Sequence, residues 1–256
     1  MSNGTVGIQG VRYYQNYRNS RGLAYGEGGW VDLDYTYNVT NGFHATMTGA
    51  GFPATFYWTG SDSWANDLFP TGVVPGGLDS SVSDDVDVFF WSGHSFNDVW
   101  DRAEIVFDSQ RDTWSSSSKL WRLGDRDLEW LMLYTCDSIR LEGIWDKYQN
   151  IFHGLHLFCA SWGSMYSGAS HAGVGRNVAE NLVDGDTVLA AWLDGTTVEN
   201  SPAVLSAERA ETWRNGDLDW PNTTMMNDHF WRRGHVKPDI PRSELGWLGV
   251  VWRHYA

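Results

Sequence analysis

The fold is decided by one short apolar run and its polar end, Leu128-Glu129-Trp130-Leu131-Met132-Leu133-Tyr134-Thr135-Cys136-Asp137-Ser138. Charged residues precede the run, and it turns polar at a cysteine. A continuous apolar run of this length is typical of a strand that is buried on both faces of a sheet. Cys136 ends the strand, at the edge where open parallel sheets form their ligand crevices.

A second stretch of the same shape comes earlier, Val86-Asp87-Val88-Phe89-Phe90-Trp91-Ser92-Gly93-His94-Ser95. It is an apolar strand that ends on Gly-His, so two strands deliver a thiol and an imidazole to the same edge. A thiol attacks carbonyl carbon as the thiolate, and a neighbouring imidazole can favour that form. An imidazole with a pKa of about 6.5 also suits proton transfer at neutral pH. We therefore predict a nucleophile at Cys136 and an acid/base at His94.

Two backbone groups complete this predicted site. The glycine before His94 allows a tight turn and a close approach of substrate to the backbone. The N–H groups of Ser95 and Cys136 are then expected to point at a developing oxyanion.

The chain after Cys136 predicts an alternation of helices and strands. Residues 141–152 have helical spacing of apolar residues and lead into an apolar strand at 155–161. Such a strand, helix and strand form a right-handed βαβ unit. Residues 173–185 follow as a helix closed by a glycine, and 187–192 fit either a strand or a second helix. The pattern predicts an α/β fold of three layers with a mostly parallel central sheet.

The remaining segments are expected to decorate one domain that spans residues 1–256, with its core at about 80–195. From Asp194 onward the sequence predicts irregular structure apart from one late strand. The other expected segments are strands at 5–17, 55–58, 105–107 and 248–252, a helix or hairpin at 30–48, a helix start at 61–67, and loops at 70–85 and 113–118.

Composition restricts the classes of partner. The net charge of −14 argues against nucleic acid and against an anionic membrane surface. No apolar stretch approaches 18 residues, and the N-terminus lacks the features of a signal peptide, so the expected location is the cytoplasm. The two cysteines do not make a disulfide scaffold. No cofactor is expected, and the sequence does not predict an oligomeric state.

The chain contains sixteen tryptophans, which are scattered and do not recur at a fixed period. Most are expected in the core, whereas Trp91, Trp162 or Trp192 could line an aromatic substrate pocket. Asp137 and Asp98 are the acidic residues closest in sequence to the predicted dyad, and they are candidates for binding a basic side chain.

Other motifs give weaker alternatives. His153, His156, Cys159 and His171 are residue types that bind metals, but no CxxC or HExxH motif accompanies them, so no metal site is predicted. Cys159 is expected to be a small core residue. The glycines at 173 and 175 lack the rest of a phosphate loop, and Ser92 and Ser161 are not in a G-x-S-x-G elbow.

The two strand ends resemble those of the caspase-like superfamily of cysteine peptidases, including its CHAT, gingipain and separase-type members. The resemblance covers roughly residues 80–195 and implies a caspase-like fold with Cys136 as the nucleophile and His94 as the acid/base. Two positions depart from the family pattern. Ser95 stands where glycine is usual, and Thr135 stands where alanine or glycine is common.

The sequence thus predicts a cysteine-dependent hydrolase that cleaves peptide or related acyl bonds, with a peptide or protein as substrate. Two alternatives use the same fold. One is a catalytically silent caspase-like domain that serves as a binding or scaffold module. The other is a ligase or cyclase, in which the same dyad passes the acyl group to an amine.

Overall fold

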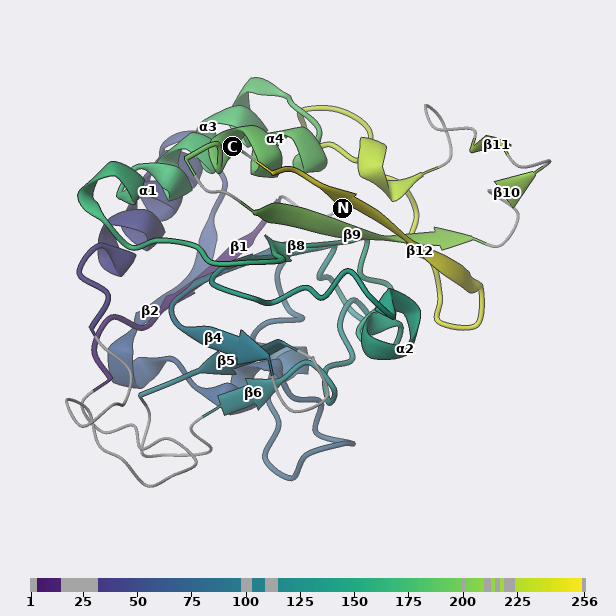
Figure 1. Cartoon of the computed structure of the whole chain (residues 1–256), viewed down its shortest axis with the longest axis horizontal. Helices are drawn as coiled ribbons and strands as arrows, with labels where there is room; N and C mark the ends of the chain where they lie inside the picture. The colour runs from purple at the N-terminus through teal and green to yellow at the C-terminus, as the bar shows by residue number, and fades with distance from the viewer. Residues whose placement is uncertain are drawn as a thin grey trace.

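A seven-stranded sheet runs through the centre of the molecule (Figure 1). The computed structural model describes residues 4–14, 32–97, 103–108, 115–198, 201–209, 213–214, 217–218 and 224–254, and structural statements concern these residues. The strand order is β12-β9-β8-β7-β3-β1-β2. The strands are β1 (Val6–Gly10), β2 (Ala54–Thr59), β3 (Val88–Ser92), β7 (Trp130–Tyr134), β8 (Leu157–Ser161), β9 (Pro202–Arg209) and β12 (Leu245–Trp252).

The sheet is mostly parallel. Strands β2, β1, β3, β7 and β8 pair in parallel with their neighbours, whereas β9 runs antiparallel to β8 and β12 antiparallel to β9. Helices and a small second sheet cover its two faces. The predicted three-layer α/β fold with a mostly parallel sheet is therefore confirmed.

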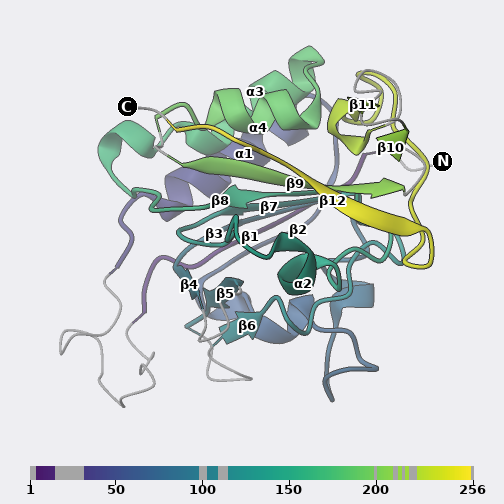
Figure 2. The same cartoon turned by 45° about the vertical axis from the view of Figure 1, so that its right-hand side comes forward.

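The two outer layers differ in kind (Figure 2). One face carries three helices, and the other carries a short helix and a three-stranded antiparallel sheet. The first layer contains α1 (Thr36–Gly49), α3 (Val174–Asp184) and α4 (Val188–Gly195), and the second contains α2 (Ile144–Tyr148), β4 (Ser95–Asn97), β5 (Ala103–Val106) and β6 (Ser115–Ser117). A two-stranded pair, β10 (Trp213–Arg214) and β11 (Asp217–Leu218), stands apart from both. Short 3₁₀ helices span Gly60–Asp62, Ala65–Leu68, Asp79–Ser81, Ala169–His171 and Met225–Asn227.

The central strands form where the sequence has continuous apolar runs. Every residue of β3, β7 and β8 is buried, as expected for strands covered on both faces. Aromatic packing joins the layers: the rings of Phe43 in α1 and Phe90 in β3 stack with centroids 4.3 Å apart. In the described part of the chain, no helix is long and apolar enough to cross a membrane.

Two ambiguous segments are helices. The segment predicted as a helix or hairpin at 30–48 contains all of α1 except its last residue, and the segment at 187–192 contains the start of α4. The side chain of Thr187 caps α4 by accepting a hydrogen bond from the N–H of Ala190 at 3.2 Å. This cap explains why an apolar run that also fits a strand begins a helix instead.

The prediction of irregular structure after Asp194 is wrong for β9, which joins the central sheet, whereas the late strand predicted at 248–252 is confirmed within β12. Strand β9 was missed because polar residues interrupt its apolar pattern. The hydroxyl of Ser206 donates to the Glu208 carboxyl inside the protein, so both polar side chains are buried there. The core therefore extends beyond the predicted range of 80–195.

Three smaller predictions also needed correction. The helix at 141–152 is only Ile144–Tyr148, and Gly143 before it has a left-handed backbone with φ 64°. The strand at 5–17 is only Val6–Gly10 in the described residues, with 15–17 outside them. The serine run predicted as a surface loop contains β6, where Ser116 is buried and accepts a hydrogen bond from the Trp121 indole at 2.8 Å.

Candidate active site

The structure brings His94 and Cys136 to one pocket at the carboxyl edge of the sheet. Strands β3 and β7 are neighbours in parallel register, from Val88 opposite Trp130 to Ser92 opposite Tyr134. His94 and Cys136 each lie two residues beyond these last partners. Both residues line a hollow of about 320 Å³, part of which is open to solvent. Its other walls include Leu33, Thr36, Met165, Tyr166 and Ser167.

Tyr14 holds the backbone at His94. The Tyr14 hydroxyl accepts a hydrogen bond from the His94 N–H at 2.7 Å and donates to the Val11 carbonyl at 3.0 Å. The two rings lie 4.7 Å apart between centroids. Burial raises the pKa of Tyr14, so the phenol stays protonated and keeps both bonds. A Cβ atom at Gly93 would lie 2.6 Å from the Tyr14 hydroxyl, which explains the glycine before the histidine.

Cys136 is half-buried, and its sulfur contacts the loop that follows β8. The N–H of Met165 donates to Sγ at 3.3 Å, and the thiol donates to the Met165 carbonyl at 3.2 Å. A backbone N–H directed at sulfur favours the thiolate, whereas the thiol's own hydrogen bond to a carbonyl favours the protonated form, so the two contacts with Met165 oppose each other. The next residue, Asp137, has a left-handed backbone with φ 44°, and its N–H donates to the Gly163 carbonyl at 2.9 Å. A strained turn of this kind is common at functional sites.

Two buried hydroxyl groups bind the carbonyl of Cys136, and a third binds one of these two hydroxyls. The hydroxyls of Ser95 and Ser138 both donate to this carbonyl, Ser138 at 3.1 Å. The Thr135 hydroxyl donates to the Ser95 hydroxyl at 2.5 Å. Ser95 and Thr135 are the two departures from the resembled pattern, and in the structure they are hydrogen-bonded to each other. They act together to fix the peptide unit that carries the cysteine.

Replacing Ser95 with alanine is expected to lower the free energy of unfolding by about 1–3 kcal/mol, because the Thr135 hydroxyl then loses its buried acceptor. The loss should be coupled to Thr135. Urea unfolding of S95A, T135A and the double variant should give an interaction energy of at least about 0.5 kcal/mol. Strictly additive losses would contradict a shared hydroxyl cluster.

The backbone N–H of Ser95 points away from β5. The N–H of Val106 donates to the His94 carbonyl at 2.9 Å, so these two residues form a hydrogen-bonded pair. Ser95 opposite Ile105 is then a non-hydrogen-bonded pair, because the two kinds alternate along an antiparallel ladder. Ser95 is not among the residues that line the pocket, so the oxyanion role of its N–H stays a prediction. The corresponding role of the Cys136 N–H stays a prediction.

The predicted substrate-contacting residues are in different environments. Trp91 and Trp192 are fully buried, which argues against contact with a substrate, and the Trp192 indole donates to the Ala160 carbonyl at 3.1 Å. Trp162 is half-buried and lines a second hollow with Arg140 and Lys147. Asp137 is half-buried beside the cysteine, and Asp98 lies outside the described residues.

No pattern in the sequence indicates Tyr14, Met165 or Ser138 as parts of this site. Tyr14 comes from the segment after β1, and Met165 from the loop after β8. Their contacts with His94 and Cys136 arise only when distant segments meet at the sheet edge. Ser138 lies two residues after the cysteine, but serine at such a position is too common to indicate a role.

The four residues considered for a metal do not converge. In the part of the chain that is described, no group of three or more His, Cys, Asp or Glu side chains is placed to hold a metal ion. Both ring nitrogens of His171 have other partners, Ser170 and the Val198 carbonyl. Cys159 is fully buried, and burial raises the pKa of its thiol.

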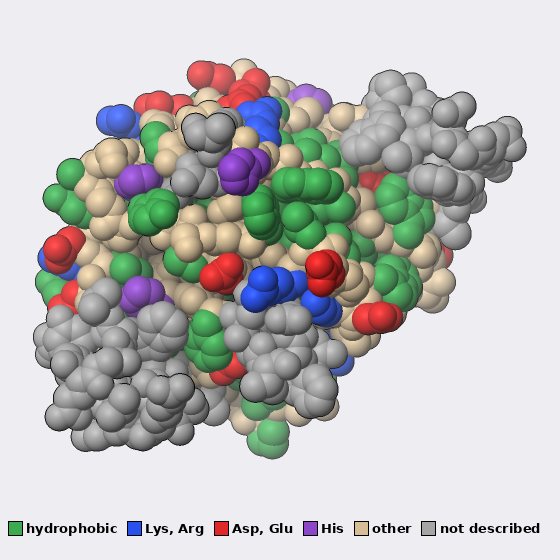
Figure 3. All heavy atoms as spheres, viewed as in Figure 1, with side chains coloured by type: hydrophobic (Ala, Val, Ile, Leu, Met, Phe, Trp, Pro, Cys, Tyr) green, Lys and Arg blue, Asp and Glu red, His purple; other side chains and the backbone are tan. Residues whose placement is uncertain are grey.

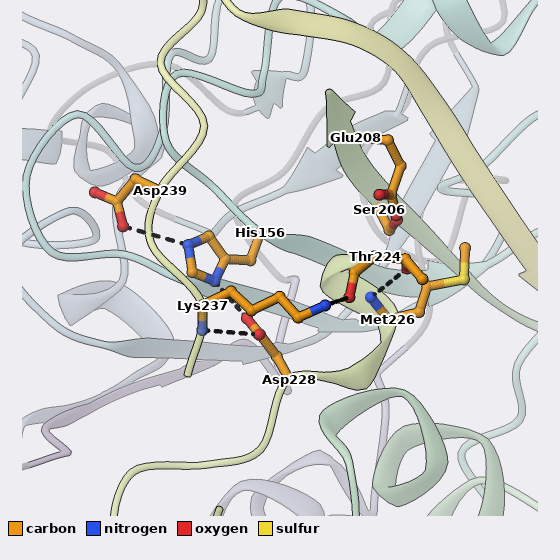
Figure 4. A network of polar contacts seen from close by, with 8 residues as sticks. All are labelled: His156, Ser206, Glu208, Thr224, Met226, Asp228, Lys237 and Asp239. Carbon is orange, nitrogen blue, oxygen red and sulfur yellow. Dashed lines mark hydrogen bonds and ion pairs between the residues drawn. The ribbon is translucent and has the colours of Figure 1, made fainter. Parts of the chain in front are cut away.

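His156 belongs to a separate polar network at the opposite edge of the sheet, just before β8 (Figure 4). Its Nδ1 lies 2.5 Å from the Asp228 carboxylate and its Nε2 lies 3.3 Å from that of Asp239. Asp228 also accepts a hydrogen bond from the backbone N–H of Lys237 at 3.0 Å. Burial alone would lower the pKa of His156, but the two carboxylates outweigh it and raise the pKa to about 9. The network therefore holds an imidazolium in the core.

Comparison with known proteins places the whole described site within one family. A search of curated proteins finds no match. A family model described as a domain of unknown function, DUF6345, matches residues 11–253 and so includes His94, Cys136 and every strand of the seven-stranded sheet except β1. The chain is a member of the DUF6345 family.

Proposed function

We propose that this protein is a cysteine-dependent hydrolase of peptide or related acyl bonds, with Cys136 as nucleophile and His94 as acid/base. One observation carries the proposal. Neighbouring parallel strands end two residues before His94 and Cys136, and both side chains line the same half-open pocket. A nucleophile and a base that share a pocket at a strained turn are the elements of nucleophilic catalysis.

The proposed reaction proceeds through an acyl-enzyme. The Cys136 thiolate attacks the carbonyl carbon, and the N–H of Ser95 donates to the oxyanion that develops. As the tetrahedral intermediate collapses, His94 gives its proton to the leaving amine and the C–N bond breaks. His94 then takes a proton from water, and the resulting hydroxide attacks the thioester; the C–S bond breaks and releases the carboxylic acid and the Cys136 thiolate, with His94 protonated again.

The caspase-like resemblance supports the same proposal. It implies a mostly parallel sheet with histidine and cysteine at the ends of two strands, and the chain has both features. The hydroxyl cluster around Ser95 also supports the proposal. Ser95 and Thr135 replace small residues of the family pattern, and their hydrogen bonds still fix the peptide unit of the cysteine.

Labelling with a substoichiometric thiol electrophile at pH 6–7, followed by intact mass and peptide mapping, tests the proposal. Fast modification of Cys136 is expected, while the buried Cys159 serves as an internal control within the same chain. Labelling of Cys136 no faster than that of a free thiol would contradict an activated dyad and favour a binding or scaffold role. If labelling is fast, a peptide library follows, and product mass separates hydrolysis, which adds water, from acyl transfer, which does not.

A further inference from the structure

The second hollow is built from the same two loops as the pocket of His94 and Cys136. One loop follows β7 and runs from Cys136 to Arg140, and the other follows β8 and runs from Trp162 to Met165. Cys136 and Met165 line the pocket, whereas Arg140 and Trp162, at the other ends of these loops, line the second hollow. The second hollow has a volume of about 720 Å³, part of which is open to solvent, so it can hold a substrate side chain.

Hydrogen bonds fix the backbone between the nucleophile and the second hollow. Every N–H from Asp137 to Arg140 has an acceptor. The N–H groups of the two residues before Arg140 donate to the Ser161 carbonyl, at 2.9 and 2.8 Å. The N–H of Arg140 donates to the hydroxyl of the buried Tyr148 at 2.8 Å. The second hollow is therefore held in a fixed position relative to Cys136, as a substrate subsite requires.

The indole of Trp162 is a fixed wall of the second hollow. Its Nε1–H donates to the Arg253 carbonyl at 3.3 Å, and its ring lies 5.8 Å from that of His254 between centroids. The backbone N–H of Trp162 donates to the Ser201 carbonyl at 3.0 Å. A half-buried aromatic ring that is held in this way offers apolar surface to the CH₂ groups of a ligand.

The charge of the second hollow is opposite to that of the chain. Arg140 and Lys147 bring two positive charges to its lining, and Glu142 brings one negative charge. The chain has 18 Lys and Arg against 32 Asp and Glu, and Lys147 is one of only three lysines. On the face drawn in Figure 3, basic side chains are scarce, and those near its centre lie among acidic ones. Two cations at one hollow favour an anion, and arginine in particular suits a carboxylate.

The pocket of His94 and Cys136 has a different character. Among the described residues that line it, none is Asp, Glu, Lys or Arg. Asp137, which was a candidate for binding a basic side chain, lines neither the pocket nor the second hollow. Substrate residues of different charge are therefore distinguished at the second hollow and not beside the reacting carbonyl. An extended peptide advances about 3.3 Å per residue, so neighbouring residues of a substrate can occupy neighbouring hollows.

We propose that the second hollow binds an acidic side chain of the peptide substrate, one or a few residues away from the bond that is cut. Arg140 and Lys147 donate to the carboxylate, and Trp162 packs against the CH₂ groups. Glutamate fits better than aspartate, because its extra CH₂ group adds contact with the indole. This inference rests on the proposed function, since it takes the ligand to be the substrate. The net charge of −14 repels acidic peptides, so a preference for them has to come from a local site.

Labelling of Cys136 by short alanine peptides that all end in the same thiol-reactive group tests the proposal. The peptides differ only in carrying Glu, Gln or Lys at one position, and each position is varied in turn. At one position, Glu should raise the labelling rate about 10-fold over Gln, and Lys should lower it. The ratio compares two peptides on the same protein, so changes in the reactivity of the thiol cancel.

The double variant R140Q/K147Q should lose the preference for Glu. The matched control Lys119→Gln, which replaces an exposed lysine that does not line the second hollow, should keep it. In the wild type, about 0.5 M salt should reduce the preference, because it screens partly exposed charges. Equal rates for Glu and Gln at every position, or a preference that survives in R140Q/K147Q, would overturn the inference and leave the proposed activity intact. If no peptide labels Cys136 faster than a free thiol, the proposed activity fails and the inference fails with it.

Discussion

Replacing His94 with alanine is expected to lower the rate at which a thiol electrophile modifies Cys136 by about 100-fold at pH 6.5. An ordinary thiol has a pKa of about 8.5, so about 1% of it is thiolate at that pH. A neighbouring imidazolium stabilises the thiolate and raises this fraction toward one. The Met165 N–H that donates to the sulfur remains in the variant, so the loss reports the imidazole itself.

The pH dependence of labelling separates this effect from a structural one. In the wild type, the rate should reach its plateau well below pH 8, whereas in H94A its midpoint should move up toward about 8.5. His171→Ala is the matched control, because His171 is a histidine outside the pocket lining shared by His94 and Cys136. It should leave the profile unchanged. An H94A profile identical to the wild type would rule out an ion pair between His94 and Cys136.

The central part of the fold could be predicted because its strands are continuous apolar runs. Strands β3, β7 and β8 are buried along their whole length, and no polar side chain interrupts their cores. Since neighbouring parallel strands end at the same edge of a sheet, the residues that follow β3 and β7 can be placed together from the sequence alone. The meeting of His94 and Cys136 in one pocket follows from that rule.

The rest depends on contacts between distant segments, which one sequence does not reveal. Strand β9 is buried except at its last residue, but Ser206 and Glu208 interrupt its apolar pattern. These two polar side chains can lie inside the protein because the Ser206 hydroxyl donates a hydrogen bond to the Glu208 carboxyl. The contact of Met165 with the cysteine sulfur likewise joins residues from separate loops. The tryptophans do not identify the pocket of His94 and Cys136, since Trp91 is buried in the core and Trp162 lines a different hollow.

Replacing Asp228 with asparagine is expected to lower the free energy of unfolding by about 3–5 kcal/mol, because it removes the charge partner of a buried imidazolium. Both His156 and Asp228 are fully buried, and Nδ1 lies 2.5 Å from the carboxylate. Asp239→Asn is the matched control at the other ring nitrogen. Its carboxylate is 57% exposed and 3.3 Å away, so its loss should cost about 1 kcal/mol or less. Urea unfolding at pH 7 measures both, and equal losses would contradict the assignment of Asp228 as the main partner.

The pH dependence of the free energy of unfolding tests whether His156 is charged in the folded protein. The pKa of His156 is raised to about 9 in the folded protein, so its stabilising effect is complete below about pH 6.5 and is lost as the pH rises through 9. Burial, together with nearby Asp87, raises the pKa of Glu129 from 4.5 to about 10, so this carboxyl also destabilises the fold progressively as the pH rises between those two values. Subtracting the D228N curve from that of the wild type removes the Glu129 contribution, which both share. The difference should fall between pH 6.5 and 9 with a slope of at most about 1.4 kcal/mol per pH unit. A difference that instead grew with pH would mean that His156 is neutral in the folded protein.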